Sequence, residues 1–350
     1  MKRIGWLLLG VMAPLPGQAQ EAAPMAEARA AIETADLAAL PPEVRAAIGR
    51  AYSVSEILQI RGVEKVPGQT LAVDELIFKP DGMIEFTGQH PWVLLFAKRM
   101  RIEDPQSLLG IRRNTALLAG PKGQAGQTGT HGARGNRRGS DGEPGRPGGR
   151  GTNGGPGATA RVPDLYIVAG RLEATATGSP LNQVRMNIDF RGVPGGAGGA
   201  GGSGGAGGDG GGGRNGRAGP FGDCRRGAGD GGDGGRGGPG GNGGAGANGG
   251  DGGAVYVIGP AAVTDIFTAG DILTGGGAGG RGGAAGLGGQ GGARGSRGSQ
   301  PGTCGGAHPG DVGATGPRGQ VGPDAQPGTR GRVFAVRIGG LDMLQAPPSP

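Results

Sequence analysis

The residues of this chain whose types and spacing could do chemistry are few, and none completes a reactive set. Residues 201–205, Gly-Gly-Ser-Gly-Gly, fit the G-x-S-x-G pattern of a serine nucleophile. Such a serine needs a strand before it, a helix after it, and an acid and a histidine later in the chain, whereas this one is flanked by glycine tracts. His90, His131 and His308 show no zinc-ligand spacing. We therefore expect no catalytic, cofactor-binding or metal-binding residues, and no enzyme.

One dense charged patch lies near predicted strands and consists of Lys98, Arg99, Arg101, Glu103 and Asp104. One interpretation is an exposed strand edge whose charges meet water. The other is the substrate face of a carbohydrate-active β-helix enzyme that acts on acidic polysaccharide, since cationic side chains attract carboxylates. The sequence alone keeps both interpretations open.

A second charged region lies within residues 120–160, where basic side chains outnumber acidic ones. The candidate anion-binding arm consists of Lys122, Arg134, Arg137, Arg138, Arg146 and Arg150. This excess either keeps a solvated arm soluble or binds an anionic polysaccharide. Aromatic residues make up 3% of the chain, so few rings are present to stack on bases, and we expect no nucleic-acid partner.

The first residues have the composition of a secretory signal peptide. Lys2 and Arg3 precede an apolar stretch over residues 4–15, and Ala19 ends a small-residue site, which predicts cleavage after residue 19. The longest later apolar stretch, residues 91–97, is too short to cross a bilayer, so we expect no transmembrane segment. The chain is expected outside the cell or on its surface, with the periplasm as the alternative.

Glycine accounts for 89 of the 350 residues and recurs at every third position in long tracts. The polyproline-II helix has three residues per turn, so a threefold glycine period leaves one side of that helix without side chains. Between residues 195 and 212 two glycines occur in each triplet, which leaves two sides bare. Bare sides let main chains approach and exchange hydrogen bonds.

In each of three glycine-rich insertions, the threefold spacing of glycine is interrupted near the middle. This predicts three hairpins, each made of two extended segments, here called arms. The insertions span residues 120–160, 193–253 and 275–331. Cys224 and Cys304 occupy the tips of the second and third hairpins. In an exported chain such a pair predicts a disulfide.

Arms with two bare sides are expected in the middle of a bundle, and those with one, such as residues 120–135 and 310–322, on its outside. The third side of residues 231–252 must then meet water and forms a candidate polar binding edge of Asp233, Arg236, Asn242, Asn248 and Asp251. A collagen-like trimer and disordered tracts are the alternatives. Collagen needs more proline than the 27 residues present.

Short strands with alternating apolar residues arrive a few residues apart once the glycine tracts are removed. This predicts a mainly β fold, a short parallel β-solenoid with three polyglycine-II hairpin insertions and a small N-terminal helical leader, with a two-sheet sandwich as the competitor. The expected divisions are a signal peptide (1–19), helical leader (20–62), solenoid start (63–119), hairpin 1 (120–160), strands (161–192), hairpin 2 (193–253), strands (254–274), hairpin 3 (275–331), final strand (332–340) and proline-rich tail (341–350).

The tracts at residues 195–203 (GGAGGAGGS) and 237–245 (GGPGGNGGA) resemble those of polyglycine-II proteins. These include bacteriophage tail-fibre-tip adhesins, the snow flea antifreeze protein and mycobacterial glycine-rich surface domains. Residues 120–157 are more similar to bacterial collagen-like proteins. The resemblance implies a packed bundle of such helices and, for several members, surface recognition, and it transfers no functional residue.

Together these features predict a non-enzymatic secreted or cell-surface protein with a structural or adhesive role, which presents a rigid polyglycine-II bundle. Its expected partner is an anionic polysaccharide or another cell-surface ligand. The alternatives are the carbohydrate-active enzyme described above and an ice-binding protein. The sequence leaves the ligand and the oligomeric state open.

Overall fold

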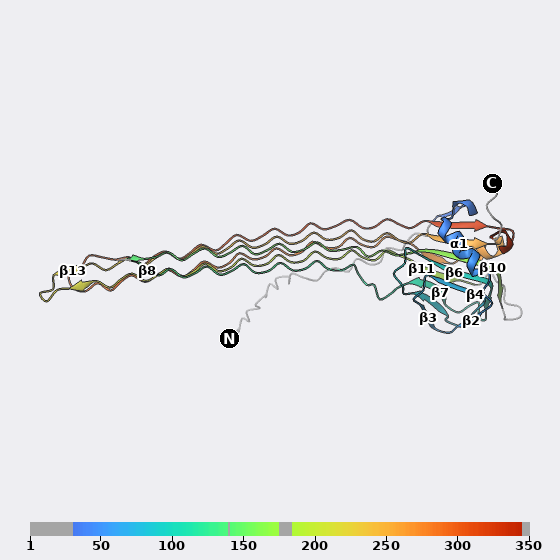
Figure 1. Ribbon diagram of the computed structural model, residues 1–350, viewed down its shortest axis with the longest axis horizontal. Helices are drawn as coiled ribbons and strands as arrows, with labels where there is room; N and C mark the ends of the chain where they lie inside the picture. The colour runs from blue at the N-terminus through green and yellow to red at the C-terminus, as the bar shows by residue number, and fades with distance from the viewer. Residues whose placement is uncertain (1–30, 139–140, 175–183, 345–350) are drawn as a thin grey trace, which may run out of the picture.

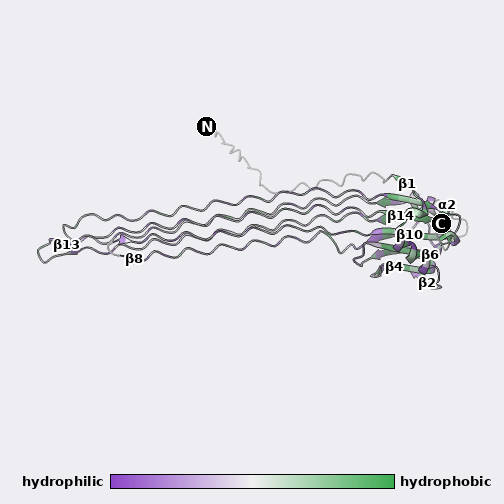
Figure 2. Cartoon of the chain, turned by 45° about the horizontal axis from the view of Figure 1, so that its top comes forward, coloured by the Kyte–Doolittle hydropathy of each residue, from purple (hydrophilic) through white to green (hydrophobic). Residues whose placement is uncertain are grey.

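The computed structural model describes residues 31–138, 141–174 and 184–344, which form two parts of different construction (Figure 1). A block of strands and helices, here called the sheet domain, lies at one end, and a long bundle of extended arms runs away from it. Hydrophobic residues gather in the sheet domain, whereas the arms have intermediate hydropathy along most of their length (Figure 2). The predicted signal peptide lies outside the described residues. None of the helices in the described part is long and apolar enough to cross a membrane.

The sheet domain contains two sheets in which every pairing is parallel. The larger has the strand order β1-β16-β14-β10-β6-β4-β2, and the smaller has the order β15-β11-β7-β5-β3. The larger sheet consists of β1 (Ile32–Thr34), β2 (Ile57–Ile60), β4 (Thr70–Phe78), β6 (Trp92–Ile102), β10 (Asp164–Ala174), β14 (Val255–Gly259) and β16 (Val333–Arg337). The smaller consists of β3 (Val63–Val66), β5 (Met83–Phe86), β7 (Leu109–Arg113), β11 (Met186–Asp189) and β15 (Asp271–Leu273).

The main hydrophobic core lies between the two sheets. Phe78 and Leu95 from the larger sheet and Phe86 from the smaller one are fully buried in it. Helix α2 (Ala261–Ala269) adds Phe267 to the same core. The sheet domain is therefore held together in the usual way, by apolar side chains removed from water.

A second hydrophobic cluster covers the other face of the larger sheet. Helix α1 (Pro42–Ala51) buries Val44 and Ile48 against residues of that face, which include Leu94 and Phe96. The short 3-10 turns η1 (Leu37–Ala39) and η3 (Leu341–Leu344) lie at its margin and place partly buried leucines against it. The central strands of the larger sheet are thus covered on both faces.

The predicted short β-solenoid is wrong. The structure has two large parallel sheets of seven and five strands with a few helices, an α/β-like arrangement that is nevertheless mainly sheet. The uninterrupted apolar run of residues 92–97 is typical of a strand covered on both faces. The predicted helical leader also differs, because within its described residues β1 and η1 occupy positions 32–39 and α1 is the α-helix that forms.

Six extended arms make up the bundle, two from each glycine-rich insertion. In chain order they are arm 1 (120–135), arm 2 (142–158), arm 3 (192–216), arm 4 (229–253), arm 5 (275–299) and arm 6 (308–331). Short antiparallel strands close the first two hairpins: β8 (Arg137–Arg138) with β9 (Asp141–Gly142), and β12 (Arg217–Ala218) with β13 (Cys224–Arg226). Arms 1, 3 and 5 run parallel in one layer, and arms 2, 4 and 6 form the second layer.

Main-chain hydrogen bonds with a period of three residues join the arms. In arm 3, Gly198 donates its N–H to the carbonyl of Arg281 in arm 5 (2.9 Å), and Gly199 donates to the carbonyl of Gly155 in arm 2 (2.9 Å). The same two bonds recur in successive triplets, as expected for helices with three residues per turn. These bonds join the arms main chain to main chain without forming a conventional sheet.

The inner positions require glycine because neighbouring main chains occupy the space of a side chain. A Cβ atom on Gly201 would overlap the carbonyl oxygen of Gly241, and one on Gly202 would overlap that of Gln127. The third residue of the triplet, Ser203, points outward and is partly exposed. A central triplet of this kind therefore has two inward glycines and one outward residue, with Ala247 of arm 4 an exception.

Arms 3 and 4 lie in the centre and are bonded to four neighbours each, whereas arms 1 and 6 are bonded to two. This agrees with the expectation that arms with doubled glycines are central. At the two free flanks, side chains replace inward glycines, as with Gln124 and Gln127 on arm 1 and Val312 and Val321 on arm 6. These side chains leave no room for a seventh arm.

Candidate functional site

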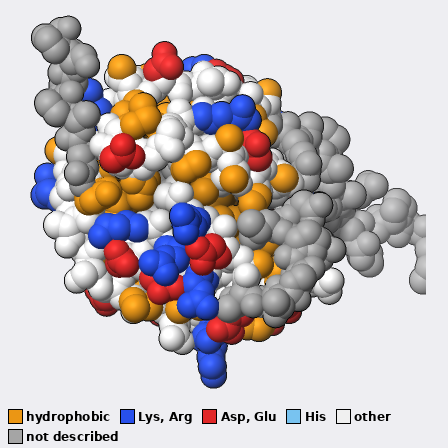
Figure 3. Space-filling view, turned by 90° about the vertical axis from the view of Figure 1, so that its right-hand side faces the viewer, with side chains coloured by type: hydrophobic (Ala, Val, Ile, Leu, Met, Phe, Trp, Pro, Cys, Tyr) orange, Lys and Arg blue, Asp and Glu red, His pale blue; other side chains and the backbone are white. Residues whose placement is uncertain are grey.

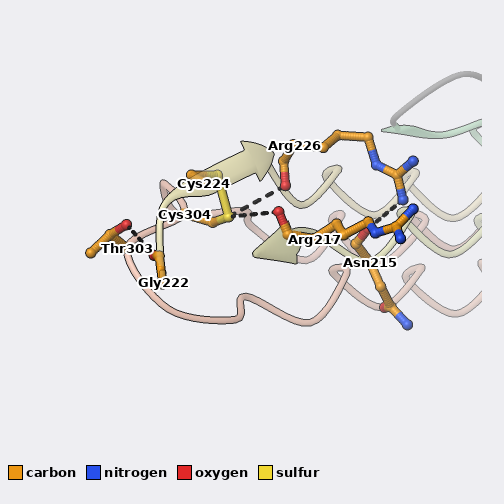
Figure 4. Close-up of a disulfide and its surroundings, with 7 residues drawn as sticks. All are labelled: Asn215, Arg217, Gly222, Cys224, Arg226, Thr303 and Cys304. Atoms are coloured by element: carbon orange, nitrogen blue, oxygen red, sulfur yellow. Dashed lines mark hydrogen bonds between the residues drawn. A yellow bond between two sulfur atoms is a disulfide. The ribbon is translucent and has the colours of Figure 1, made fainter. Parts of the chain in front are cut away.

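The far end of the bundle is made of the turns of the second and third hairpins (Figure 4). Cys224 and Cys304, 80 positions apart in the sequence, form a disulfide with their Cα atoms 4.8 Å apart, which confirms the predicted pairing. The hydroxyl of Thr303 donates a hydrogen bond to the carbonyl of Gly222 (3.0 Å). The two hairpin ends are thus joined covalently and by hydrogen bonding into one unit, here called the tip.

Phe221 is presented to solvent at the tip. The N–H of Gly222 donates to the carbonyl of Gly219 (3.1 Å), which closes a turn around Pro220 and Phe221. Gly222 has a φ of 80°, which residues with side chains rarely adopt. The side chain of Phe221 is 96% exposed. A phenylalanine held in water by a constrained turn, in a chain so poor in aromatic residues, is a candidate contact for a partner.

Arginines flank this phenylalanine in the sequence. Arg217 in β12 and Arg225 and Arg226 in β13 are all exposed, and Asp223 is the acidic residue among them. A guanidinium nitrogen of Arg226 donates to the carbonyl of Asn215 (3.3 Å), which holds that side chain on the bundle side of the tip (Figure 4). The tip therefore combines an apolar contact with a net positive charge.

The candidate polar edge lies on the face formed by the outward residues of arms 2, 4 and 6, here called the polar face. The Asp and Asn residues of arm 4 on this face accept hydrogen bonds from outward N–H groups of arm 6. Five such bonds join Asp230 to His308 (2.6 Å), Asp233 to Asp311 (2.7 Å), Asn242 to Gln320 (2.9 Å), Asn248 to Gln326 (3.2 Å) and Asp251 to Thr329 (2.7 Å). Four of the five candidate residues thus stabilise the bundle directly, and Arg236 is the exception.

The side-chain acceptors of arm 4 avoid the positions that face proline in arm 6. Residues 78 positions apart lie in the same row of arms 4 and 6. Pro317 and Pro323, which have no N–H to donate, face Pro239 and Ala245, so no acceptor is placed opposite them. Every outward Asp or Asn of arm 4 therefore faces a residue that can donate.

At Asp251 the pairing of arms 4 and 6 involves a carboxylate whose charge strengthens the hydrogen bonds. Its carboxylate accepts from the Thr329 N–H and also from the Thr329 hydroxyl (2.7 Å). These bonds favour the charged form and hold the pKa of Asp251 below its usual value. The row is thus strongest when the carboxylate is ionised.

The predicted basic arm is not one site. Lys122 and Arg134 are exposed on arm 1, and Arg146 and Arg150 are exposed on arm 2. Arg137 and Arg138 lie in β8, at the end of the first hairpin. Arg150 belongs to this set and lines a shallow pocket together with Asn242 of the candidate polar edge.

The charged patch of the sheet domain is largely neutralised by ion pairs. Two of its basic residues pair with acidic residues of β4, Lys98 with Asp74 (2.9 Å) and Arg101 with Glu75 (3.2 Å), and its Glu103 pairs with Lys79. Arg99 is exposed, and Asp104 accepts from the N–H of Gln106 (3.0 Å). Basic and acidic side chains also lie side by side on the end of the domain facing away from the bundle (Figure 3).

The other residues with chemical potential are spread out. Ser203 lies in arm 3, where its carbonyl accepts from Gly129 (2.8 Å), so its surroundings are extended arms. Within the part of the chain that the structure describes, His, Cys, Asp and Glu form no group of three or more that could hold a metal ion.

Comparisons with known proteins give little further guidance. No family model matches this chain, and no curated protein matches it. A solved structure, the springtail antifreeze protein from Granisotoma rainieri, described as a nine polyproline type II helical bundle, is 24% identical, covering 58% of this chain and 93% of its own. With a TM-score of 0.09, this likeness supports no conclusion about fold or function, and it does not establish a collagen-like family.

Sequence reasoning located the tip through its cysteines but missed Phe221. The available signal was an aromatic residue between Pro220 and Gly222, in the turn of a hairpin otherwise made of glycine and polar residues. The pairing of arms 4 and 6 was missed because it depends on their relative register. That register follows from the lengths of the turns and cannot be read from either arm alone.

Proposed function

We propose that this protein is a non-enzymatic, exported structural or adhesive protein whose bundle is a rigid spacer that carries the tip to a partner surface. The observation that carries the proposal is the exposure of Phe221 on a disulfide-joined turn at the end farthest from the sheet domain. A side chain that contributes nothing to the core of its own chain is available for a partner.

The surrounding charge favours an anionic partner surface. Arg217, Arg225 and Arg226 can form charge-assisted hydrogen bonds with carboxylate or sulfate groups, and Phe221 can pack on an apolar or sugar surface beside them. An acidic cell-surface polysaccharide has both features. Attachment at the tip would place the sheet domain at the full length of the bundle from that surface.

Binding of purified protein to cells and to a panel of acidic and neutral surface polysaccharides tests this proposal. The wild type is expected to bind acidic members, and Phe221→Ser and Arg225→Ala are each expected to weaken binding by about tenfold. Phe221→Ser should leave thermal unfolding unchanged, because the replaced side chain is exposed. Absence of binding across the whole panel would remove the adhesive role.

An enzymatic role makes a different prediction. A hydrolase or lyase would shorten acidic polysaccharide during prolonged incubation, and Arg101→Ala would abolish that activity. We expect no shortening by either protein, since Arg101 is paired with Glu75 in the sheet domain. Turnover that depends on Arg101 would contradict the proposal.

A further inference from the structure

A shallow pocket of about 270 Å³ opens on the polar face, between arms 2, 4 and 6 and away from the tip. Its polar lining consists of Arg150, Asn153, Asn242, Arg318 and Gln320. All of these side chains are exposed. The pocket is therefore open to a ligand from solvent.

The pocket arises from the order of residues along the arms. Pro239 and Pro317 line it in one row, and the next row holds Asn153, Asn242 and Gln320. Proline rings are short and lack an N–H, so the first row forms a low apolar floor. The longer polar side chains stand beside that floor.

The two asparagines line the pocket, and each side-chain amide carries N–H donors. The side-chain oxygen of Asn153 accepts from the N–H of Asn242 (2.9 Å), and the side-chain oxygen of Asn242 accepts from the N–H of Gln320 (2.9 Å). Because the oxygens are held by the backbone, each NH₂ group has a fixed direction. These donors are arranged before any ligand arrives, which lowers the entropy cost of binding.

The charge of the pocket is positive. Arg150 and Arg318 line it, and neither forms an ion pair or side-chain hydrogen bond with the residues that the structure describes. No Asp or Glu belongs to the lining. Two guanidinium groups beside fixed amide donors select a ligand that accepts hydrogen bonds and carries negative charge.

We propose that this pocket binds a carboxylated sugar residue, such as a uronic acid within a polysaccharide. The arginines would bind the carboxylate, the asparagine amides would donate to ring and hydroxyl oxygens, and the proline floor would contact the apolar C–H face. This inference goes beyond the proposed function, because it concerns a different site and would hold if the tip bound nothing.

The decisive experiment compares two substitutions of asparagine by aspartate on arm 4. Asn242→Asp keeps the oxygen that accepts from Gln320 but replaces the NH₂ donor by negative charge inside the pocket. Asn248→Asp makes the same change at a residue with the same kind of bond, to Gln326, outside the pocket. Both variants should fold, so a difference between them reports on binding.

The probe is an oligogalacturonate of about four residues, with its fully methyl-esterified form as the neutral control and inorganic phosphate as the simple anion, measured by calorimetry. We expect the wild type and Asn248→Asp to bind the acidic oligomer within about twofold of each other, and Asn242→Asp to bind about tenfold more weakly. The neutral and phosphate probes should bind far less tightly. Equal binding by the two variants would overturn the proposal, as would absence of binding by the wild type or phosphate binding as tight as that of the oligomer.

A second pair of variants separates this site from general charge and from the tip. Replacing Arg150 and Arg318 together by alanine should weaken binding by at least about tenfold, whereas Arg236→Ala, an arginine of the same face outside the pocket, should change it by less than about twofold. Phe221→Ser can remove only binding at the tip, so the part of the binding that depends on Arg150 and Arg318 should stay unchanged in that variant. Loss of binding in Phe221→Ser with retention in the double variant would assign the ligand to the tip and overturn the inference.

Discussion

The sheet domain and the bundle each have a packed interior, which is made of apolar side chains in the first and of main chain in the second. In the sheet domain, residues such as Phe86 and Leu95 remove apolar side chains from water between two sheets. In the bundle, the interior consists of main chain, and Gly198 and Gly199 show how inward residues replace side-chain contacts by hydrogen bonds to two neighbouring arms. The comparison teaches that a protein interior can be specified by where side chains are missing.

The two interiors should also differ in what they tolerate. An apolar core accepts side chains of similar volume, because its contacts are not directional. Inward positions such as Gly202 have no spare volume, since a single Cβ there meets a carbonyl oxygen, whereas outward positions accept any residue that leaves the arm extended. The predictions below test this contrast.

The largest effect is expected in the sheet domain. Phe86→Ala removes a ring that is 1% exposed in the main core and should lower the free energy of unfolding of this domain by about 4 kcal/mol. Chemical denaturation monitored by tryptophan fluorescence measures this, since Trp92 begins β6. The bundle should keep its protection from hydrogen exchange at the same denaturant concentration; loss of both parts together would show that the bundle cannot persist without the domain.

A single methyl group should have nearly as large an effect in the bundle. Gly202→Ala places a Cβ against the carbonyl of Gln127 and should cost about 3 kcal/mol of bundle stability, seen as lower melting of the extended arms by circular dichroism. Gly212→Ala is the matched control on the same arm, because the nearest atom to its added Cβ is the Ser296 hydroxyl oxygen, 3.3 Å away. Equal effects of the two substitutions would contradict a main-chain interior.

Outward residues should change stability by about 1 kcal/mol, in a direction set by the facing residue. Arg236→Asn places an acceptor opposite Ala314, whose N–H has no acceptor among the described residues, and should stabilise the bundle by up to about 1 kcal/mol. Ala245→Asn faces Pro323 and should give no gain, because proline has no N–H. Thermal unfolding of the two variants measures the difference, and a gain in both would disprove the pairing rule.

The smallest effect is expected from pH. The depressed pKa of Asp251 means that its stabilisation is complete above the unfolded pKa of about 4 and is lost as pH falls through the lower folded pKa. Asp251→Asn keeps an oxygen that accepts from Thr329 but does not titrate. The wild type should therefore lose stability relative to this variant as pH falls below about 4, and parallel pH profiles would show that the carboxylate bonds contribute nothing.

The sequence carried more information about the bundle than about the sheet domain. The threefold glycine period fixes the backbone of each arm, and doubled glycines over residues 195–212 predicted a central position, because only an arm with two bare sides can have four neighbours. Equivalent positions in successive hairpins also sufficed to pair Cys224 with Cys304.

The sheet domain was predicted less well, for a physical reason. Short strands a few residues apart indicate parallel pairing but do not say how many layers cover each face. The run over residues 92–97 contained that information, because an uninterrupted apolar strand must be covered on both sides, and α1 provides the second cover. The pocket on the polar face could not be predicted at all, because Arg150, Asn242 and Arg318 come from three arms whose register depends on turn geometry.

The central claim, that main chain packed on main chain replaces an apolar interior in the bundle, is tested most directly by residue-resolved amide hydrogen exchange along arm 3. The claim predicts protection with a period of three: the N–H groups of Gly198 and Gly199 and their equivalents in each triplet should exchange slowly, whereas those of Ala197, Ala200 and Ser203, which point outward, should exchange quickly. Rapid exchange at all three positions of each triplet would contradict it.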